Sequence, residues 1–299
     1  MTDQMDSCLG IGYHRSTSGV PLGLDLTGMR MNESPKYWSS AVSDVQNNTV
    51  YIRGYDLGDL IGKLSFADAT YLLIRGSLPT PGQAAMIEGV LCSVLDYSLR
   101  KPGTAAARFC VSSNPSMVAG LATAVLSAGE YSLAPDQTGL FLNKTIEAAK
   151  QAESFEAAAN HLVEGMRGRK ERVPGLGHPA FKYTDPRAQQ LKQLAIETGV
   201  WGEVCEWYEA VHKAFTTQAG KPEIVINEVG MMGAILAQMG FTPAEMTGLA
   251  VISTMPGVIA HISEELQSKV RIRVIPDDQV DYARERRNFA EDIDQFKKG

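Results

Sequence analysis

The sequence predicts a mainly α-helical protein, and three observations point to this class. Apolar residues recur three or four positions apart along most of the chain, as they do on the buried face of a helix. Glycine and proline separate these helical patterns from one another. Strand-like runs do not alternate with them, as they would in a protein built on a parallel sheet. The 299 residues contain neither an internal repeat nor a low-complexity linker and correspond to one or two domains.

Composition and charge argue against several kinds of partner. An apolar content of 44% and a charged content of 21% are those of an ordinary globular protein. The net charge of −6 does not favour nucleic acid, and no apolar run has the length that a bilayer-spanning helix needs. The four cysteines are scattered without a C-x-x-C pair, so no metal site is expected. The acidic, polar first residues are unlike a secretory signal, and we expect a cytoplasmic protein.

The first part of the chain reads as an irregular arm followed by helices. Residues 1–35 are rich in glycine and turn residues, and no chemistry is expected there. A short strand is predicted over residues 50–52, and Asp56 and Ser65 are placed to cap the next two helices. Further helices are expected over residues 82–99, 105–110 and 117–128, with a break at 101–103. The last of these is apolar nearly all round, which predicts a buried helix.

Helical patterns continue through the rest of the chain. Two are expected within residues 137–166, and others over residues 188–196, 203–215, 229–238, 242–252 and 257–266. The tail from Asp277 is strongly charged and reads as a solvated helix able to embrace a neighbouring subunit.

A stretch rich in glycine and proline interrupts these helices and is the candidate functional site. It comprises residues 173–187, V-P-G-L-G-H-P-A-F-K-Y-T-D-P-R. Glycine lets a backbone approach a ligand closely, and a histidine beside it can donate to a carbonyl or exchange a proton near neutral pH. The Asp-Pro-Arg that follows supplies a planar cation suited to a carboxylate. Taken alone, a G-x-G-H is as well explained by a surface turn with a capping histidine.

The spacing of this stretch resembles the signature of the citrate synthase superfamily, which includes citryl-CoA lyases. The glycine pair, the histidine, the lysine four residues on and the D-P-R all match, whereas Pro179 replaces the arginine usual there. The resemblance implies a citrate synthase-like fold, with a large all-α domain and a smaller α domain inserted into it. The large domain would comprise residues 36–136 and 226–299, and the small domain residues 137–225. Ligands would bind between the two, and the chain would form a homodimer.

The resemblance also implies roles for residues of the signature. His178 would contact the ketone or hydroxyl of an organic acid, and Arg187 would bind a carboxylate. Coenzyme A would be a substrate or co-substrate without a metal, and the implied coenzyme A-binding residues are Pro174, Gly175, Leu176, Gly177 and Lys182.

Several positions that carry chemistry in the family differ in this chain. Ser132 stands where the family has its first catalytic histidine. Val229 stands where it has the aspartate base, and the neighbouring Glu228 is the candidate replacement. Tyr97 and Thr254 replace two further substrate-binding residues. Arg273, with Arg271 beside it, is a candidate for the carboxylate-binding arginine that a partner subunit donates in this family.

These departures leave three functions open. The first is an enzyme that makes or breaks a carbon–carbon bond, or a thioester, in an acyl-CoA-type substrate with fewer carboxylates than citrate. His178 would act as its acid or base, assisted by Ser132 or Tyr97. The second is a homologue without catalysis that binds coenzyme A or an organic acid, or serves as a scaffold. The third is ordinary family activity, which would mean that Ser132 and Val229 are wrongly aligned.

Overall fold

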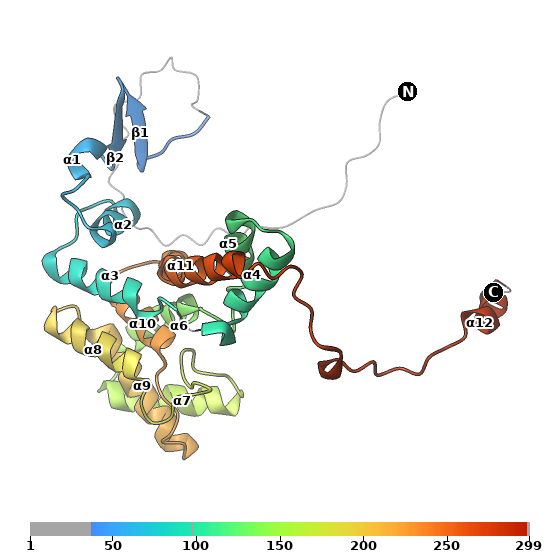
Figure 1. Cartoon of the computed structure of the whole chain (residues 1–299). Helices are drawn as coiled ribbons and strands as arrows, with labels where there is room; N and C mark the ends of the chain where they lie inside the picture. Colours follow the sequence, from blue (N-terminus) through green and yellow to red (C-terminus); the bar gives the residue numbers. More distant parts are fainter. Residues whose placement is uncertain (1–36, 97, 298–299) are drawn as a thin grey trace, which may run out of the picture. The chain divides into compact units, whose positions relative to one another are not determined.

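The computed structural model describes residues 37–96 and 98–297 (Figure 1), so the arm expected over residues 1–35 and the candidate Tyr97 lie outside the described residues. Ala41–Gly299 form one compact unit, and Met1–Ser40 are a separate unit. The described part of the larger unit contains helices α1–α12 and one small three-stranded sheet. The mainly α class is confirmed. The division into a large and a small helical domain stays a prediction.

An antiparallel sheet in the order β1-β2-β3 opens the larger unit. Its strands are β1 (Ser43–Gln46), β2 (Thr49–Ile52) and β3 (Tyr55–Asp56). Asn47 and Asn48 join β1 to β2 with φ angles of 50° and 61°, a backbone conformation that asparagine tolerates better than most residues. The Asp56 side chain then accepts a hydrogen bond from the amide of Gly58 and caps α1 (Leu57–Leu60).

The next helices are α2 (Phe66–Arg75), α3 (Pro81–Ser93), α4 (Pro102–Ser113) and α5 (Met117–Leu126). The helix expected over residues 82–99 ends at Ser93, and Ser98–Arg100 form a separate 3₁₀ turn. The expected break at 101–103 is where α4 begins, because proline is favoured in the first turn of a helix. The expectation that residues 117–128 are buried is wrong for the single chain, since Val118 is 75% and Leu126 is 85% exposed. Only the small Gly120 and Ala124 of α5 are buried.

Helix α10 lies at the centre of the second half of the chain (Figure 1). The helices here are α6 (Pro135–Lys150), α7 (Phe155–Gly168), α8 (Pro186–Glu197), α9 (Glu203–Ala219), α10 (Glu228–Gln238) and α11 (Pro243–Ser268). α10 packs against α6, α8 and α9, and nine of its eleven residues are buried. α7 packs against α9, and α3 packs against α8.

Helix α11 replaces the two helices that were expected over residues 242–252 and 257–266. Pro256 lies inside it, and the amide of Gly257 donates to the carbonyl of Leu95 at 3.1 Å. A Cβ at Gly257 would lie 2.2 Å from that carbonyl oxygen, so glycine allows the close approach. By length and composition α11 qualifies as a membrane span, but it packs against α3, α4, α5 and α6, as the core helix of a globular protein does.

The C-terminal tail is less helical than its charge pattern suggested. The residues described after α11 form the 3₁₀ turn η3 (Asp277–Gln279) and the helix α12 (Phe289–Phe296). The continuous helix expected from Asp277 is therefore wrong, because η3 and α12 are separated by an irregular segment.

Candidate active site

The candidate loop, residues 173–187, is held against the segment that leads into α10. The amide of Gly177 donates to the carbonyl of Val225 at 2.7 Å, and the amide of Asn227 donates to the carbonyl of Gly175 at 2.9 Å. The side-chain amide of Asn227 donates to the carbonyl of Gly177 at 2.8 Å, while its oxygen caps α10 at the amide of Gly230. The loop and the start of α10 thus share one hydrogen-bond network, which fixes the position of His178 beside that helix.

Gly175 has a φ of +73°, and the space around it excludes a side chain. A Cβ there would lie 2.4 Å from the hydroxyl of Tyr208 and 2.5 Å from the Cα of Gly230. The Tyr208 hydroxyl donates to the carbonyl of Pro174 at 2.8 Å and completes this contact. Gly177 has a φ of +87°, but a Cβ added to it would meet no atom within 4 Å.

We expect Gly175→Ala to destabilise the fold far more than Gly177→Ala does. Both changes place alanine in the left-handed region, which costs about 1–2 kcal/mol. Only Gly175→Ala adds a clash inside a packed core, worth about 1–3 kcal/mol more. Chemical denaturation of both variants measures the difference. Equal losses of unfolding free energy in the two variants would contradict the close packing of Gly175 against α10.

Asp185 is a fully buried carboxylate that joins the starts of two helices. It caps α8, because its Oδ1 accepts from the amide of Arg187 at 3.1 Å. Its Oδ2 accepts from the amide of Glu228, the first residue of α10, also at 3.1 Å. The guanidinium of Arg187 donates to both oxygens, from Nε at 3.1 Å and from Nη2 at 2.8 Å. This two-point pairing compensates the buried charge and fixes the orientation of Arg187.

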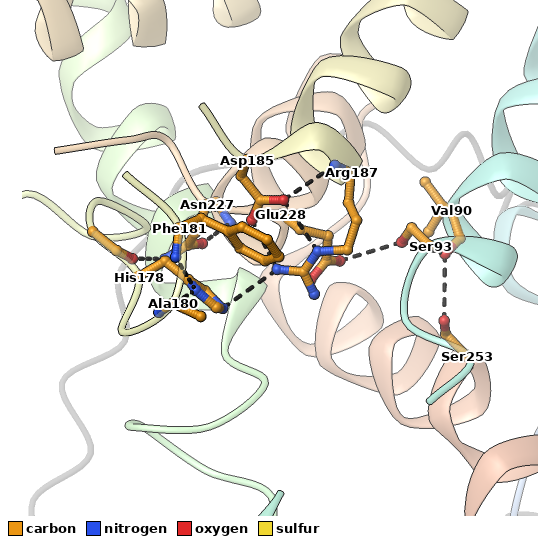
Figure 2. Close-up of polar contacts among 12 residues, drawn as sticks. Val90, Ser93, His178, Ala180, Phe181, Asp185, Arg187, Asn227, Glu228 and Ser253 are labelled. Carbon is orange, nitrogen blue, oxygen red and sulfur yellow. Dashed lines mark hydrogen bonds and ion pairs between the residues drawn. The ribbon is translucent and has the colours of Figure 1, made fainter. Parts of the chain in front are cut away.

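His178 is held in one orientation by its own loop (Figure 2). Its Nδ1 accepts from the amides of Ala180 and Phe181 at 3.0 and 3.1 Å, which assigns the proton of the neutral ring to Nε2. Nε2 lies 3.4 Å from Nη2 of Arg187. Partial burial first, and then the charge of Arg187, lower the pKa of His178, so the ring is neutral at pH 7. Two N–H donors therefore lie side by side, as the recognition of a substrate oxygen requires.

Glu228 is the buried acid of the site and is 1% exposed. Its Oε1 accepts from the hydroxyl of Ser93 at 3.2 Å, and its Oε2 lies 3.8 Å from Nη1 of Arg187. Figure 2 shows the resulting row from His178 through Arg187 and Glu228 to Ser93, which links the loop, α8, α10 and α3. Burial raises the pKa of Glu228 to about 7 and outweighs the opposing charge of Arg187. A carboxyl of this kind exchanges protons near neutral pH.

The raised pKa of Glu228 predicts that stability falls as the pH rises through the range between its ordinary value of 4.5 and about 7. Between these values the folded carboxyl keeps a proton that the unfolded chain releases, so the unfolding free energy falls by about 3 kcal/mol across this range. Glu228→Gln should flatten this dependence of the unfolding free energy, measured by denaturation at a series of pH values. The exposed Glu88→Gln on α3 is the control and should keep the wild-type slope. A Glu228→Gln slope equal to that of the wild type would contradict the buried, protonated carboxyl.

A narrow cleft, with about 20 Å³ of space for water-sized molecules, gathers further predicted residues. Ser132 and Thr254 both line it, together with Lys101 and Asp96. The carboxylate of Asp96 also lies 3.1 Å from Nε2 of His261. Sequence reasoning missed Lys101, because a lysine before Pro-Gly-Thr looks like part of a connection between helices.

The other described residues predicted from the sequence lie outside the cleft. Val229 is half-buried at the start of α10, Pro174 and Leu176 are half-buried in the loop, and Lys182 is exposed. Arg273 belongs to another cluster, where its guanidinium donates to both oxygens of the buried Glu265. The structure thus brings His178, Arg187 and Glu228 together, and the roles of all these residues stay predictions. Within the described residues no group of three or more His, Cys, Asp or Glu side chains is placed to hold a metal.

Comparison with known proteins places the fold. A family profile described as "Citrate synthase, C-terminal domain" matches residues 81–274. Citrate synthase 2 of Bacillus subtilis is 24% identical over 201 residues, covering 67% of this chain and 52% of that protein. Citrate synthase of Deinococcus radiodurans is 23% identical over 235 residues, covering 78% of this chain and 60% of that protein. The chain therefore spans between half and two thirds of the length of these relatives.

A solved structure, the citryl-CoA lyase from Hydrogenobacter thermophilus, matches with a TM-score of 0.78 and 32% identity. The match covers 85% of this chain and 97% of that one. The ATP citrate lyase from Methanothrix soehngenii, at 20% identity and a TM-score of 0.72, shares the fold. A profile match over more than half of the chain, together with this structural likeness, shows that the chain belongs to the citrate synthase family.

Proposed function

We propose that this protein is an enzyme that makes or breaks a carbon–carbon bond, or a thioester, in an acyl-CoA-type substrate. The observation that carries the proposal is the convergence of His178, Arg187 and Glu228 in one network. It combines two neighbouring nitrogen groups, 3.4 Å apart, with a carboxyl whose pKa is about 7. The 32% identity to a citryl-CoA lyase along nearly its whole chain supports the same class of reaction.

In this mechanism the donors act on the oxygen of the organic acid. Nε2–H of neutral His178 and the guanidinium of Arg187 donate to the ketone oxygen in the condensation direction. In the cleavage direction the substrate hydroxyl gives its proton to water and the same donors stabilise the alkoxide. This oxygen becomes the ketone when the carbon–carbon bond breaks, and the electron pair passes to the carbon next to the thioester, which then takes up a proton. Because both donors are oriented beforehand by loop amides and by Asp185, little reorganisation is needed during the reaction.

The proton at the carbon next to the thioester requires an acid–base group, and Glu228 is our candidate. The carboxyl is covered in this structure, so the mechanism includes an opening that exposes it to substrate. Such an opening follows if residues 137–225, which carry His178 and Arg187, move as a small domain against residues 36–136 and 226–299. Coenzyme A would lie along Pro174 to Gly177, and the exposed Lys182 suits its phosphates.

The acid part of the substrate would carry fewer carboxylates than citrate. Ser132, Val229 and Thr254 are uncharged at positions where the family resemblance implies ionisable groups. An uncharged residue at such a position can neither pair with a carboxylate of the substrate nor stabilise a charge in the transition state.

Calorimetric titration and a turnover assay on the same mixtures test the proposal, and the turnover assay measures free thiol for hydrolysis and acetyl-CoA by chromatography for carbon–carbon cleavage. The wild-type protein is titrated with coenzyme A and acetyl-CoA, each with and without oxaloacetate and citrate. It is then assayed with citryl-CoA and with 3-hydroxyacyl-CoA esters that carry fewer carboxylates. We expect coenzyme A to bind and the less charged esters to be turned over faster than citryl-CoA, with acetyl-CoA and an oxo compound formed by carbon–carbon cleavage or free thiol formed by thioester hydrolysis. Faster turnover of citryl-CoA would overturn the proposed substrate class, and no turnover of any ester would overturn the enzymatic function.

A second candidate function is binding without turnover. Val229 is apolar at the position expected for the base, and Glu228 is covered, so neither position exposes a carboxylate for proton abstraction. The two functions differ in one observable. A binding protein retains affinity for coenzyme A or an organic acid, whereas neither free thiol nor acetyl-CoA is formed from any ester.

We also propose that the chain forms a homodimer through α5. This helix leaves Val118, Val125 and Leu126 exposed, and an apolar surface of this kind is typical of an interface. Sedimentation at several concentrations measures the assembly, and a monomer throughout would contradict the proposal.

A further inference from the structure

Lys101 is a cation in the cleft that neither the motif nor the network around His178 uses. It directly precedes α4, is half-buried, and shares the cleft with the hydroxyls of Ser132 and Thr254. Apolar side chains form much of the remaining wall, among them Val125, Leu133, Val251, Met255 and Val258. A long flexible lysine at such a place presents its charge to whatever occupies the cleft.

The nearby carboxyl groups pair elsewhere, Glu228 with Arg187 and Asp96 with His261, and no ion pair to the ammonium of Lys101 is found among the described residues. Burial lowers its pKa, and the negative charges of Glu228 and Asp96 oppose this effect without either carboxyl forming an ion pair with it. The positive charge of Arg187 also lowers the pKa of Lys101. The charge of Lys101 is therefore partly removed from water and is repelled by the charge of Arg187. An anionic ligand at Lys101 would offset both unfavourable effects.

We propose that Lys101 binds a carboxylate of the organic-acid part of the substrate, inside the cleft lined by Ser132 and Thr254. The inference rests on the proposed function and adds a residue to it. It also changes the expected charge of the pocket, because the uncharged Ser132 and Thr254 share their cleft with a lysine. The acid would then span two cations, with one oxygen group at Arg187 and His178 and a carboxylate at Lys101.

Binding at Lys101 would also act on Glu228. The charges of Arg187 and Lys101 both lower the pKa of this carboxyl, against the larger effect of burial. A carboxylate bound to Lys101 neutralises one of the two charges, so the pKa of Glu228 rises further when substrate is present. The enzyme–substrate complex therefore retains the proton that cleavage must deliver to carbon.

The test compares Lys101→Met and Lys101→Arg with wild-type protein. Calorimetry measures the affinity for oxaloacetate and for malonate, a simple dicarboxylate probe, and the formation of acetyl-CoA or free thiol gives KM and kcat for the best ester. We expect Lys101→Met to weaken acid binding at least about tenfold, the usual effect of losing one charged contact. KM should rise by a similar factor with a smaller change in kcat. Lys101→Arg, which keeps the cation, should restore most of the affinity.

Lys63→Met, at an exposed lysine paired with Asp59, is the matched control and should bind as wild type does. The thermal midpoint of each variant separates a binding defect from misfolding. If Lys101→Met weakens acid binding but no ester is turned over, the inference stands and the proposed enzymatic function falls. If Lys101→Met keeps wild-type affinity and KM, or if wild-type protein binds neither acid, the inference is overturned even where turnover is found.

Discussion

Arg187→Ala should lower the unfolding free energy by about 3–5 kcal/mol, the usual cost of removing one partner of a buried ion pair. The variant leaves the carboxylate of Asp185 fully buried without the two guanidinium bonds that compensate it. It also removes the cation that lies 3.8 Å from Glu228. Urea denaturation measures the loss, and calorimetry should show that affinity for oxaloacetate falls with it.

Two companion variants show whether the ion pair is the cause. Arg187→Lys keeps a positive charge but not the two-point geometry, so its loss should be smaller than that of alanine. Asp185→Asn combined with Arg187→Ala removes the unpaired charge and keeps one side-chain oxygen, which can accept from one of the two backbone amides, that of residue 187 or that of Glu228. The double variant should be more stable than Arg187→Ala alone. If it is less stable, desolvation of Asp185 is not the source of the loss.

The elements of the fold that sequence predicted best are those whose ends carry local signals. Asp56 and Ser65 are predicted as caps, and their side chains accept from the amides of Gly58 and Asp68 at the starts of α1 and α2. Predictions failed where tertiary contacts decide. Gly257 bonds to the carbonyl of Leu95 and lets α11 continue past Pro256, and no local pattern encodes that partner. The exposure of α5 is likewise set by which surface it packs on and not by its own composition.

Sequence identified part of the site because that part lies in one short motif. His178 and Arg187 are nine residues apart, and their spacing alone placed them together. Glu228 comes from a distant segment and was named only as the neighbour of Val229. Its burial and its contact with Ser93 on α3 depend on the packing of helices. Lys101 was missed for the same reason, since nothing before or after it in the sequence indicates a cleft.

His178→Ala should reduce turnover about 100- to 10,000-fold, the usual loss when a positioned proton donor is removed. Stability should change less than in Arg187→Ala, because the ring is half-buried and its Nδ1 partners are loop amides. Since the pKa of His178 is lowered, the neutral ring persists below the ordinary value of 6.5, and activity that needs it should decline only at lower pH. The exposed His161→Ala on α7 is the control, with wild-type turnover expected. Steady-state kinetics across pH measure both effects, and unchanged kcat/KM in His178→Ala would exclude this ring from the reaction.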